Sequence, residues 1–142
     1  MYQVKIKKLS ADAIIPCASY EGDAGLDLFS VDNAVLKPGK RALIRTGIAI
    51  ELPSDTEAQI RPRSGYALDN GITVLNSPGT IDQGYRNEIG VILVNHGEED
   101  FIIKKGMKVA QLVIKPTYRI AFEEVSELGA SDRGTSGYGS SS

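Results

Sequence analysis

Cysteine and histidine are nearly absent from this chain of 142 residues, which contains only Cys17 and His96. A single cysteine excludes an internal disulfide and any cysteine-rich metal site, and it fits a reducing compartment. A Ser-His-Asp or Cys-His mechanism would depend on His96. Because the sequence Asn95-His96-Gly97 is typical of a loop, we interpret His96 as a turn residue and not as a catalytic one.

Long apolar runs are also absent. No segment approaches the ~20 apolar residues of a membrane-spanning helix, and the sequence MYQVKIKK at the start alternates like a β-strand, unlike the apolar core of a signal sequence. Neither sign of charge dominates, because 16 Lys and Arg oppose 18 Asp and Glu, giving a formal net charge of -2 and a pI near 5.4. We therefore expect a soluble, cytoplasmic protein that binds neither nucleic acid nor a membrane.

The Walker phosphate-binding pattern is missing as well. No glycine-rich loop ends in Lys-Ser or Lys-Thr, and the chain has no internal repeat and no Cys/His spacing typical of a metal site. A chain of this length forms one domain that buries about two-thirds of its unfolded surface. If the protein binds phosphate, a few individually placed cations must therefore hold it.

The chain does contain a series of short apolar patterns separated by turn residues. These patterns predict strands over residues 4–9, 26–30, 41–52, 57–61, 72–75, 90–95, 101–103, 107–114 and 119–125, of which 41–52 is one strand or two with a bend at Gly47. Residues 65–70 predict one short helix, with Ser64 as its N-cap and Gly71 as its stop. From Gly129 onwards the composition offers almost nothing to bury. We expect an all-β domain over residues 1–128 and a flexible, Gly/Ser-rich arm over residues 129–142.

The stretch from Asn76 to Glu88 places charge, an aromatic ring and turn residues between two strand patterns, which predicts a hairpin. Asp82 and Tyr85 would project from a bent ribbon whose main-chain groups are partly unpaired near the turns. A planar ligand with alternating donors and acceptors, such as a pyrimidine edge, would satisfy these groups. Alternatively, Asp82 bonds to its own turn and Tyr85 forms a cross-strand pair.

Other polar residues are candidates for binding an anion or a cation. The hydroxyl of Ser64, with the N–H groups that follow it, forms an anion site beside Arg63, or else Ser64 is a plain cap and Arg63 is solvated. Gln111 is an amide in an apolar strand, so it either satisfies main-chain groups or reaches the pocket of Ser64. Asp27 is either a solvated edge residue or an outer-shell ligand of a hard cation such as Mg²⁺.

The C-terminal segment combines Arg133 and Tyr138 with a Gly/Ser background. Its main-chain N–H groups can close over phosphates while the Tyr138 ring stacks on a base. Because ordering the segment costs entropy, such an arm suits a ligand-gated lid. The alternative is an ordinary disordered terminus.

Five segments, taken together and in this order, resemble the five motifs of the trimeric deoxyuridine triphosphatases (dUTPases). They are AGLDLFS at residues 24–30, PRSG at 62–65, GTIDQGYRNE at 79–88, GMKVAQL at 106–112 and RGTSGYGS at 133–140. The resemblance covers nearly the whole chain. It implies a β-clip or jelly-roll-like domain assembled as a homotrimer with exchange of the C-terminal arms. It also implies Mg²⁺-dependent hydrolysis of dUTP to dUMP and pyrophosphate, which controls the dUTP pool and supplies the dTTP precursor.

The resemblance also implies roles for individual residues. One chain would contribute Asp27, Ser64 and Gln111 to a site, a second chain the hairpin, and a third the arm. Asp82 would be the general base that activates the attacking water, and Asp27 would contact Mg²⁺ through water. The implied substrate-binding residues are Arg63, Ser64, Gly65 and Gln111 for the phosphates, Asn76, Thr80, Ile81 and Tyr85 for the nucleoside, and Arg133, Gly137 and Tyr138 from the arm.

Three positions depart from the family pattern. Asn87 stands where Gly is usual, Ser136 replaces a second Gly of the arm, and Tyr138 replaces the commoner Phe. Asn tolerates a positive φ and Tyr keeps a stacking face, so Ser136 is the departure that puts arm closure in doubt. Two other functions stay open: a dCTP deaminase-like enzyme on the same type of fold, and a nucleotide-gated regulatory protein.

Overall fold

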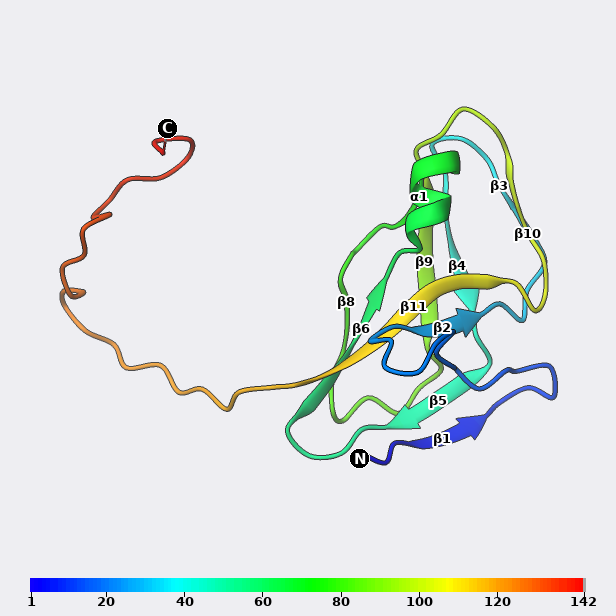
Figure 1. Cartoon of the computed structure of the whole chain (residues 1–142), viewed down its shortest axis with the longest axis horizontal. Helices are drawn as coiled ribbons and strands as arrows, with labels where there is room; N and C mark the ends of the chain where they lie inside the picture. Colours follow the sequence, from blue (N-terminus) through cyan, green and yellow to red (C-terminus); the bar gives the residue numbers. More distant parts are fainter. Residues whose placement is uncertain (142) are drawn as a thin grey trace.

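Short antiparallel strands form nearly all of the regular structure in the computed structural model, which describes residues 1–141 (Figure 1). The strands are β1 (Lys5–Lys8), β2 (Leu26–Phe29), β3 (Ala34–Leu36), β4 (Arg41–Arg45), β5 (Ile48–Glu51), β6 (Thr56–Arg61), β7 (Ile72–Val74), β8 (Gly79–Ile81), β9 (Gly90–Asn95), β10 (Phe101–Ile103) and β11 (Lys108–Pro116). One helix, α1 (Ser64–Asn70), lies between β6 and β7. The expected all-β, jelly-roll-like domain with one short helix is confirmed.

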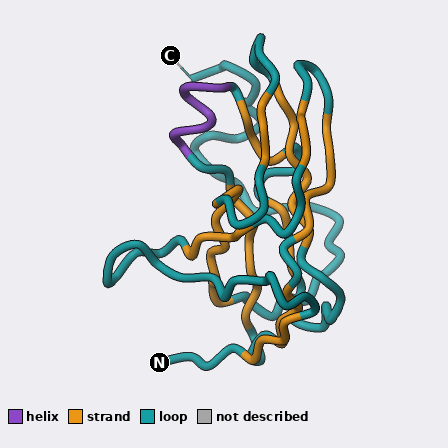
Figure 2. The backbone as a smooth tube through the Cα atoms, turned by 90° about the vertical axis from the view of Figure 1, so that its right-hand side faces the viewer, coloured by secondary structure: helices purple, strands orange, loops and turns teal. Residues whose placement is uncertain are grey.

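The strands form a four-stranded sheet in the order β2-β11-β6-β8, a three-stranded sheet in the order β4-β9-β7, and the two-stranded pairs β1-β5 and β10-β3. Figure 2 shows these strands gathered in one body, with the helix at its side. Leu28, Ile60 and Leu112 of the first sheet share one apolar cluster with Ile44 and Leu93 of the second. The two sheets therefore cover a common core.

Strand β6 shows how the sequence pattern produces this arrangement. Its buried residues Thr56, Ala58 and Ile60 alternate with the half-exposed residues of the opposite face. Because successive side chains of a strand point to opposite faces, this alternation fixes which face meets the core. A slip of one residue would move Ala58 and Ile60 out of the core.

The predicted hairpin is confirmed, because β7 and β9 pair antiparallel with Thr73 opposite Val94. Its loop contains an additional strand, since β8 leaves the hairpin and pairs with β6. The pattern over residues 41–52 forms two strands, and they are separated at Gly47, whose φ is 69°. Gly71 ends α1 with a φ of 69°, as predicted.

Two predictions about secondary structure are wrong. Ser64 is the first residue of α1 and not its N-cap, because Arg63 occupies the cap position with extended backbone and no side-chain cap hydrogen bond. No strand forms over residues 119–125. The alternating pattern there has no partner strand in its own chain, and a strand without a partner is not stable in water.

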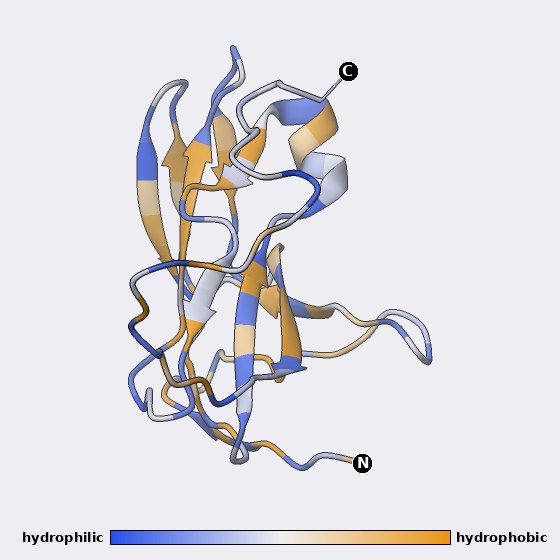
Figure 3. Cartoon of the chain, turned by 90° about the vertical axis from the view of Figure 1, so that its left-hand side faces the viewer, coloured by the Kyte–Doolittle hydropathy of each residue, from blue (hydrophilic) through white to orange (hydrophobic). Residues whose placement is uncertain are grey.

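The last strand ends at Pro116, and the chain then leaves the body as an extended segment (Figure 1). Tyr118, Ile120 and Phe122 are all at least 75% exposed. Apolar and polar residues alternate in this segment, which is coloured by hydropathy in Figure 3. Ser142, the last residue of the expected arm, lies outside the described residues. Within residues 1–141, no helix has the length and apolar character needed to cross a membrane.

Candidate active site

The register of the four-stranded sheet places three polar residues in one row. Gln111 on β11 lies opposite Asp27 on β2 and opposite Arg61 on β6. Because only Pro62 and Arg63 separate β6 from Ser64, the start of α1 lies beside this row. The residues predicted for the phosphate site are far apart in the sequence. The fold therefore brings them together at one end of the sheet.

Asp27 is the centre of this group, and only 2% of the residue is exposed. Its carboxylate accepts hydrogen bonds from the guanidinium of Arg63 and the hydroxyl of Ser19, and the Lys108 ammonium lies 2.8 Å from Oδ2. Burial alone would raise the pKa of Asp27, but the hydrogen bond from Lys108 and the charges of Arg63 and Lys108 outweigh it and lower the pKa. Asp27 is therefore an ionised, buried residue, and its interpretation as a solvated edge residue is wrong.

The Arg63 guanidinium is held on a second side by an aromatic ring. Its central carbon lies 5.7 Å from the ring centroid of Tyr66, within the range of a cation–π contact. Tyr66 in turn packs edge-to-face on Phe101, with centroids 5.1 Å apart. The Arg63 side chain remains 28% exposed, so it can reach a ligand in solvent.

Gln111 lies against Gly25, which precedes β2. A Cβ atom on Gly25 would be 2.9 Å from Oε1 of Gln111, which is closer than side-chain atoms pack. Gly25 is therefore needed for the observed position of the amide, beside the start of α1.

A pocket of about 170 Å³ lies where the hairpin meets β6. Predicted nucleoside-binding residues line it, with apolar neighbours: Ile60, Asn76, Gly79, Thr80, Ile81, Tyr85, Ile89 and Gly90. β8 is the edge strand of its sheet, so its outer main-chain groups have no strand partner among residues 1–141. A planar ring in the pocket could pair with these groups.

Asp82 follows β8 directly and is exposed. Its carbonyl accepts the N–H of Tyr85 at 3.0 Å, which closes a turn. The carboxylate of Asp82 forms no hydrogen bond within the described part of the chain, so it is free to bind water. Tyr85 donates its hydroxyl to the carbonyl of Glu88 at 2.9 Å, an alternative to the cross-strand pair considered from the sequence.

Asp82 and Arg63 lie toward opposite ends of β6. Asp82 follows Ile81, which pairs with Ala58, and Arg63 is five residues beyond Ala58. At a rise of ~3.3 Å per residue, the backbones of Ala58 and Arg61, the last residue of β6, lie about 10 Å apart along the strand, and Arg63 lies two residues further on. One chain thus separates the carboxylate from the cation.

The predicted arm residues do not join either group in this chain. The arm extends away from the body (Figure 1), and Tyr138 is fully exposed. Arg133 donates to the carbonyl of Ser136 at 2.9 Å, which is a contact within the arm. Gly137 also lies within this arm.

Lys108 is a site residue that sequence reasoning missed. It belongs to the 106–112 segment, but only the pairing of β11 with β2 brings its ammonium to Asp27. Residues 1–141 contain no group of three or more His, Cys, Asp or Glu residues suited to hold a metal ion.

A pocket with free main-chain groups suits a planar ring, and the cationic row at the end of the sheet suits an anion. An all-β domain with this combination of sites suits a small anionic nucleotide. The family model described as dUTPase matches residues 11–142. The chain belongs to the dUTPase family, and the prediction of an enzyme of this family is confirmed.

Individual relatives agree with this assignment. The chain is 62% identical to the deoxyuridine 5'-triphosphate nucleotidohydrolase of Clostridium acetobutylicum, over 99% of this chain and 97% of that protein. The corresponding protein of Clostridioides difficile is 58% identical, over 99% and 98%. A dUTPase of Staphylococcus bacteriophage 80alpha, solved with dUPNHPP, has a TM-score of 0.91 at 28% identity, over 99% of this chain and 98% of that one.

Proposed function

We propose that this chain forms a homotrimer that hydrolyses dUTP to dUMP and pyrophosphate with Mg²⁺, and that it works in the cytoplasm. The observation that carries the proposal is the position of Asp82. Its free carboxylate stands at the end of the edge strand that lines the hairpin pocket. The phage 80alpha dUTPase was solved with the analogue dUPNHPP, which supports the assignment of a nucleotide to this pocket.

In this proposal the uracil ring enters the pocket beside β8. Outer main-chain groups of Thr80 and Ile81, together with the Asn76 amide, pair with the edge of the base. Tyr85 packs against the deoxyribose, where a ribose 2'-hydroxyl would clash. A thymine methyl would not fit beside the ribbon, and cytosine would present a donor where an acceptor is needed.

The phosphates bind at the row beside α1. Arg63, Ser64, Gly65 and Gln111 hold them, with Lys108 close by on Asp27. Arg63 can exchange the carboxylate of Asp27 for a phosphate without being left unpaired. Asp27 would then keep Lys108 as its cationic partner.

Asp82 accepts a proton from a water molecule as the water oxygen bonds to the α-phosphorus. The bond from the α-phosphorus to the bridging oxygen breaks, and pyrophosphate leaves. Fixing water and phosphate in line supplies much of the rate enhancement, because it removes the entropy cost of bringing them together.

Mg²⁺ fits this site only through water. Both carboxylate oxygens of Asp27 already have a cationic partner, so direct coordination does not suit them. Oδ2 has two donors, Ser19 and Lys108, whereas Oδ1 has only Arg63 and keeps a lone pair for a water of a hydrated ion, which matches the tendency of Mg²⁺ to retain waters. The dUTPase of phage phi11 of S. aureus was solved with a structural Mg(II) ion. Bound Mg²⁺ would neutralise the phosphate charge.

The homotrimer with exchanged arms is supported by the separation of Asp82 from Arg63 and by the exposed arm. An apolar groove of about 260 Å³ on the body is lined partly by Val4, Ile6, Ile15 and Ile114. Nothing in the described part of the same chain buries the apolar side chains of Tyr118, Ile120 and Phe122. In a trimer the groove and these residues can cover each other, and the arm continues to a neighbour's pocket. There Arg133 and Gly137 would contact phosphate, and Tyr138 would stack on uracil.

The test is pyrophosphate release from dUTP, measured against dTTP, dCTP and UTP, with and without Mg²⁺. We expect release from dUTP alone, and only with the metal. Ammonia release from dCTP is measured in parallel. Ammonia without pyrophosphate would show a deaminase, and binding of dUTP without either product would favour a nucleotide-gated regulatory protein.

A further inference from the structure

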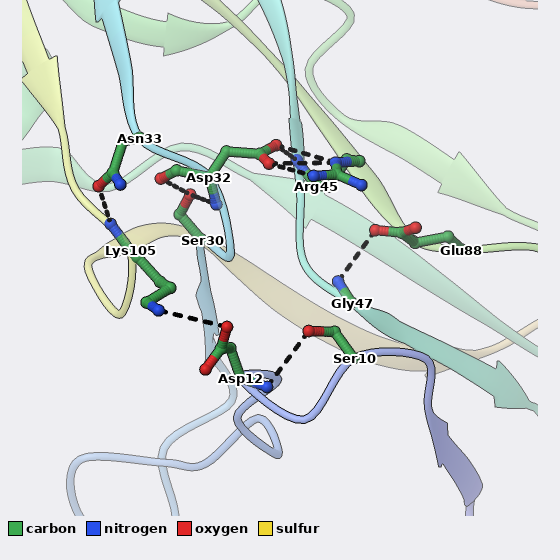
Figure 4. Close-up of polar contacts among 9 residues, drawn as sticks. All are labelled: Ser10, Asp12, Ser30, Asp32, Asn33, Arg45, Gly47, Glu88 and Lys105. Carbon is green, nitrogen blue, oxygen red and sulfur yellow. Dashed lines mark hydrogen bonds and ion pairs between the residues drawn. The ribbon is translucent and has the colours of Figure 1, made fainter.

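Glu88, which lies two residues before β9 in the hairpin loop, is attached to a turn in a distant part of the sequence. Its Oε2 accepts the N–H of Gly47 at 3.0 Å, as Figure 4 shows. The neighbouring Ile89 is held at the same turn by two hydrogen bonds. Its N–H donates to the carbonyl of Ile48 at 2.8 Å, and its carbonyl accepts the hydroxyl of Thr46 at 2.5 Å.

The turn that receives Glu88 is itself tightly fixed. Gly47 has a φ of 69°, and a Cβ there would lie 3.0 Å from side-chain atoms of Ala13 and Val31. Only glycine fits both constraints. Thr46 and Ile89 are each 1% exposed. The N–H of Gly47 therefore offers Glu88 a rigid point of attachment.

Glu88 in turn fixes Tyr85. The Tyr85 hydroxyl donates to the carbonyl of Glu88 at 2.9 Å, and its N–H donates to the carbonyl of Asp82 at 3.0 Å. Tyr85 lines the hairpin pocket. Glu88 thus makes both contacts, through its carboxylate to Gly47 and through its main-chain carbonyl to the Tyr85 ring that lines the pocket.

The nearby cation Arg45 does not replace this contact. Its guanidinium is bound to Asp32 at 2.6 Å (Figure 4), and that pair is the first cause of the raised pKa of Arg45, with Glu88 the weakest. The carboxylate of Glu88 is therefore used mainly as a hydrogen-bond acceptor for the main chain.

We propose that Glu88 is a positioning residue that holds the Tyr85 ring in place and thereby sets the discrimination between deoxyribonucleotides and ribonucleotides. This inference rests on the proposed function, in which Tyr85 packs against the deoxyribose. Glu88 itself does not touch the substrate. It acts through the distance between the Tyr85 ring and the sugar.

The test compares Glu88→Ala with Glu88→Gln, using the ratio of kcat/KM for dUTP to kcat/KM for UTP. The amide oxygen of Gln still accepts the Gly47 N–H, so Glu88→Gln should keep the ratio. Glu88→Ala should lower it by about tenfold, the effect expected from losing one hydrogen bond to a buried amide. Glu51→Gln removes an exposed pair with Lys5 and serves as the control with an unchanged ratio.

Thermal unfolding of each variant separates positioning from stability. A merely structural role would lower Tm in Glu88→Ala and leave the ratio unchanged, which would overturn the inference. If Glu88→Ala does not fold, Glu88→Asp decides, because its carboxylate is one methylene shorter and is drawn away from the Gly47 N–H. An unchanged ratio in Glu88→Asp would also overturn the inference. Absence of dUTP hydrolysis in the wild type would instead contradict the proposed function.

Discussion

Asp27 and Arg63 form an ion pair between β2 and the start of α1, although they are 36 residues apart in the sequence. The pair joins the sheet to the segment proposed to bind phosphate. It therefore affects both the stability of the fold and the charge of the site.

The first prediction concerns the pH dependence of stability. The pKa of Asp27 is lowered in the folded state, so its contribution to stability is present above the ordinary value of 3.8 and is lost as the pH falls through the folded pKa. Asp27→Asn should lower the free energy of unfolding at pH 7 by about 1–3 kcal/mol, because it weakens the partner of two cations. The difference from wild type should shrink below about pH 4.

Urea unfolding at pH 7, 5, 4 and 3 measures this difference. Asp12→Asn is the matched control, since Asp12 forms an exposed pair with Lys105 and should contribute little at any pH. A difference between wild type and Asp27→Asn that stays constant down to pH 3 would show that the charge of Asp27 is not the cause.

The second prediction links Gly25 to Gln111. Gly25→Ala should displace the Gln111 amide and raise KM for dUTP with little change in Tm, because a flexible side chain can move at low cost. Gln111→Ala should have a similar effect. The double variant should be no worse than either single variant, since both remove the same interaction. Additive effects on KM would mean that Gly25 acts by another route.

The third prediction tests the general base. Asp82→Asn should keep its affinity for a non-hydrolysable dUTP analogue and lose about 10²–10⁴-fold in kcat. Calorimetry gives the affinity, and single-turnover pyrophosphate release gives the rate. Asp82 is exposed, so the substitution should leave the fold intact, and circular dichroism checks this. Unimpaired turnover would remove Asp82 from the mechanism.

The fourth prediction concerns the arm. Deletion of residues 133–142 should leave a folded trimer with little activity, because the arm residues described here bury nothing in their own body. Tyr138→Phe should retain activity and Tyr138→Ala should lose it, since only Phe keeps a stacking face. Sedimentation measures assembly and pyrophosphate release measures activity. Full activity after truncation would exclude a lid.

Local patterns in the sequence were enough to predict much of the fold. The hairpin of β7 and β9 and the helix stop at Gly71 depend on alternation and turn residues that lie close together in the chain. The pairing of β8 with β6 could not be predicted in this way, because no local rule states which distant strand an edge will meet. The prediction of a strand over residues 119–125 was wrong for the same reason. Its alternating pattern needs a partner strand, and the same chain provides none there.

The residues of the candidate site also fall into those that are close in sequence and those that only the fold brings together. Asn76, Thr80, Ile81 and Tyr85 are close in sequence, and the structure places them around one pocket. The contact of Lys108 with Asp27 depends on strand register, and the contact of Glu88 with Gly47 depends on a turn 41 residues away. Such long-range contacts follow from packing and not from any local motif.

Asp82 and Arg63 lie toward opposite ends of β6 in one chain. This separation has a consequence for trimers that contain two kinds of chain. If each site draws its carboxylate and its arm from different subunits, two inactive chains can complement each other. An Asp82→Asn chain still supplies an intact arm, and a truncated chain still supplies Asp82. Co-refolding the two should therefore regain activity that neither possesses separately.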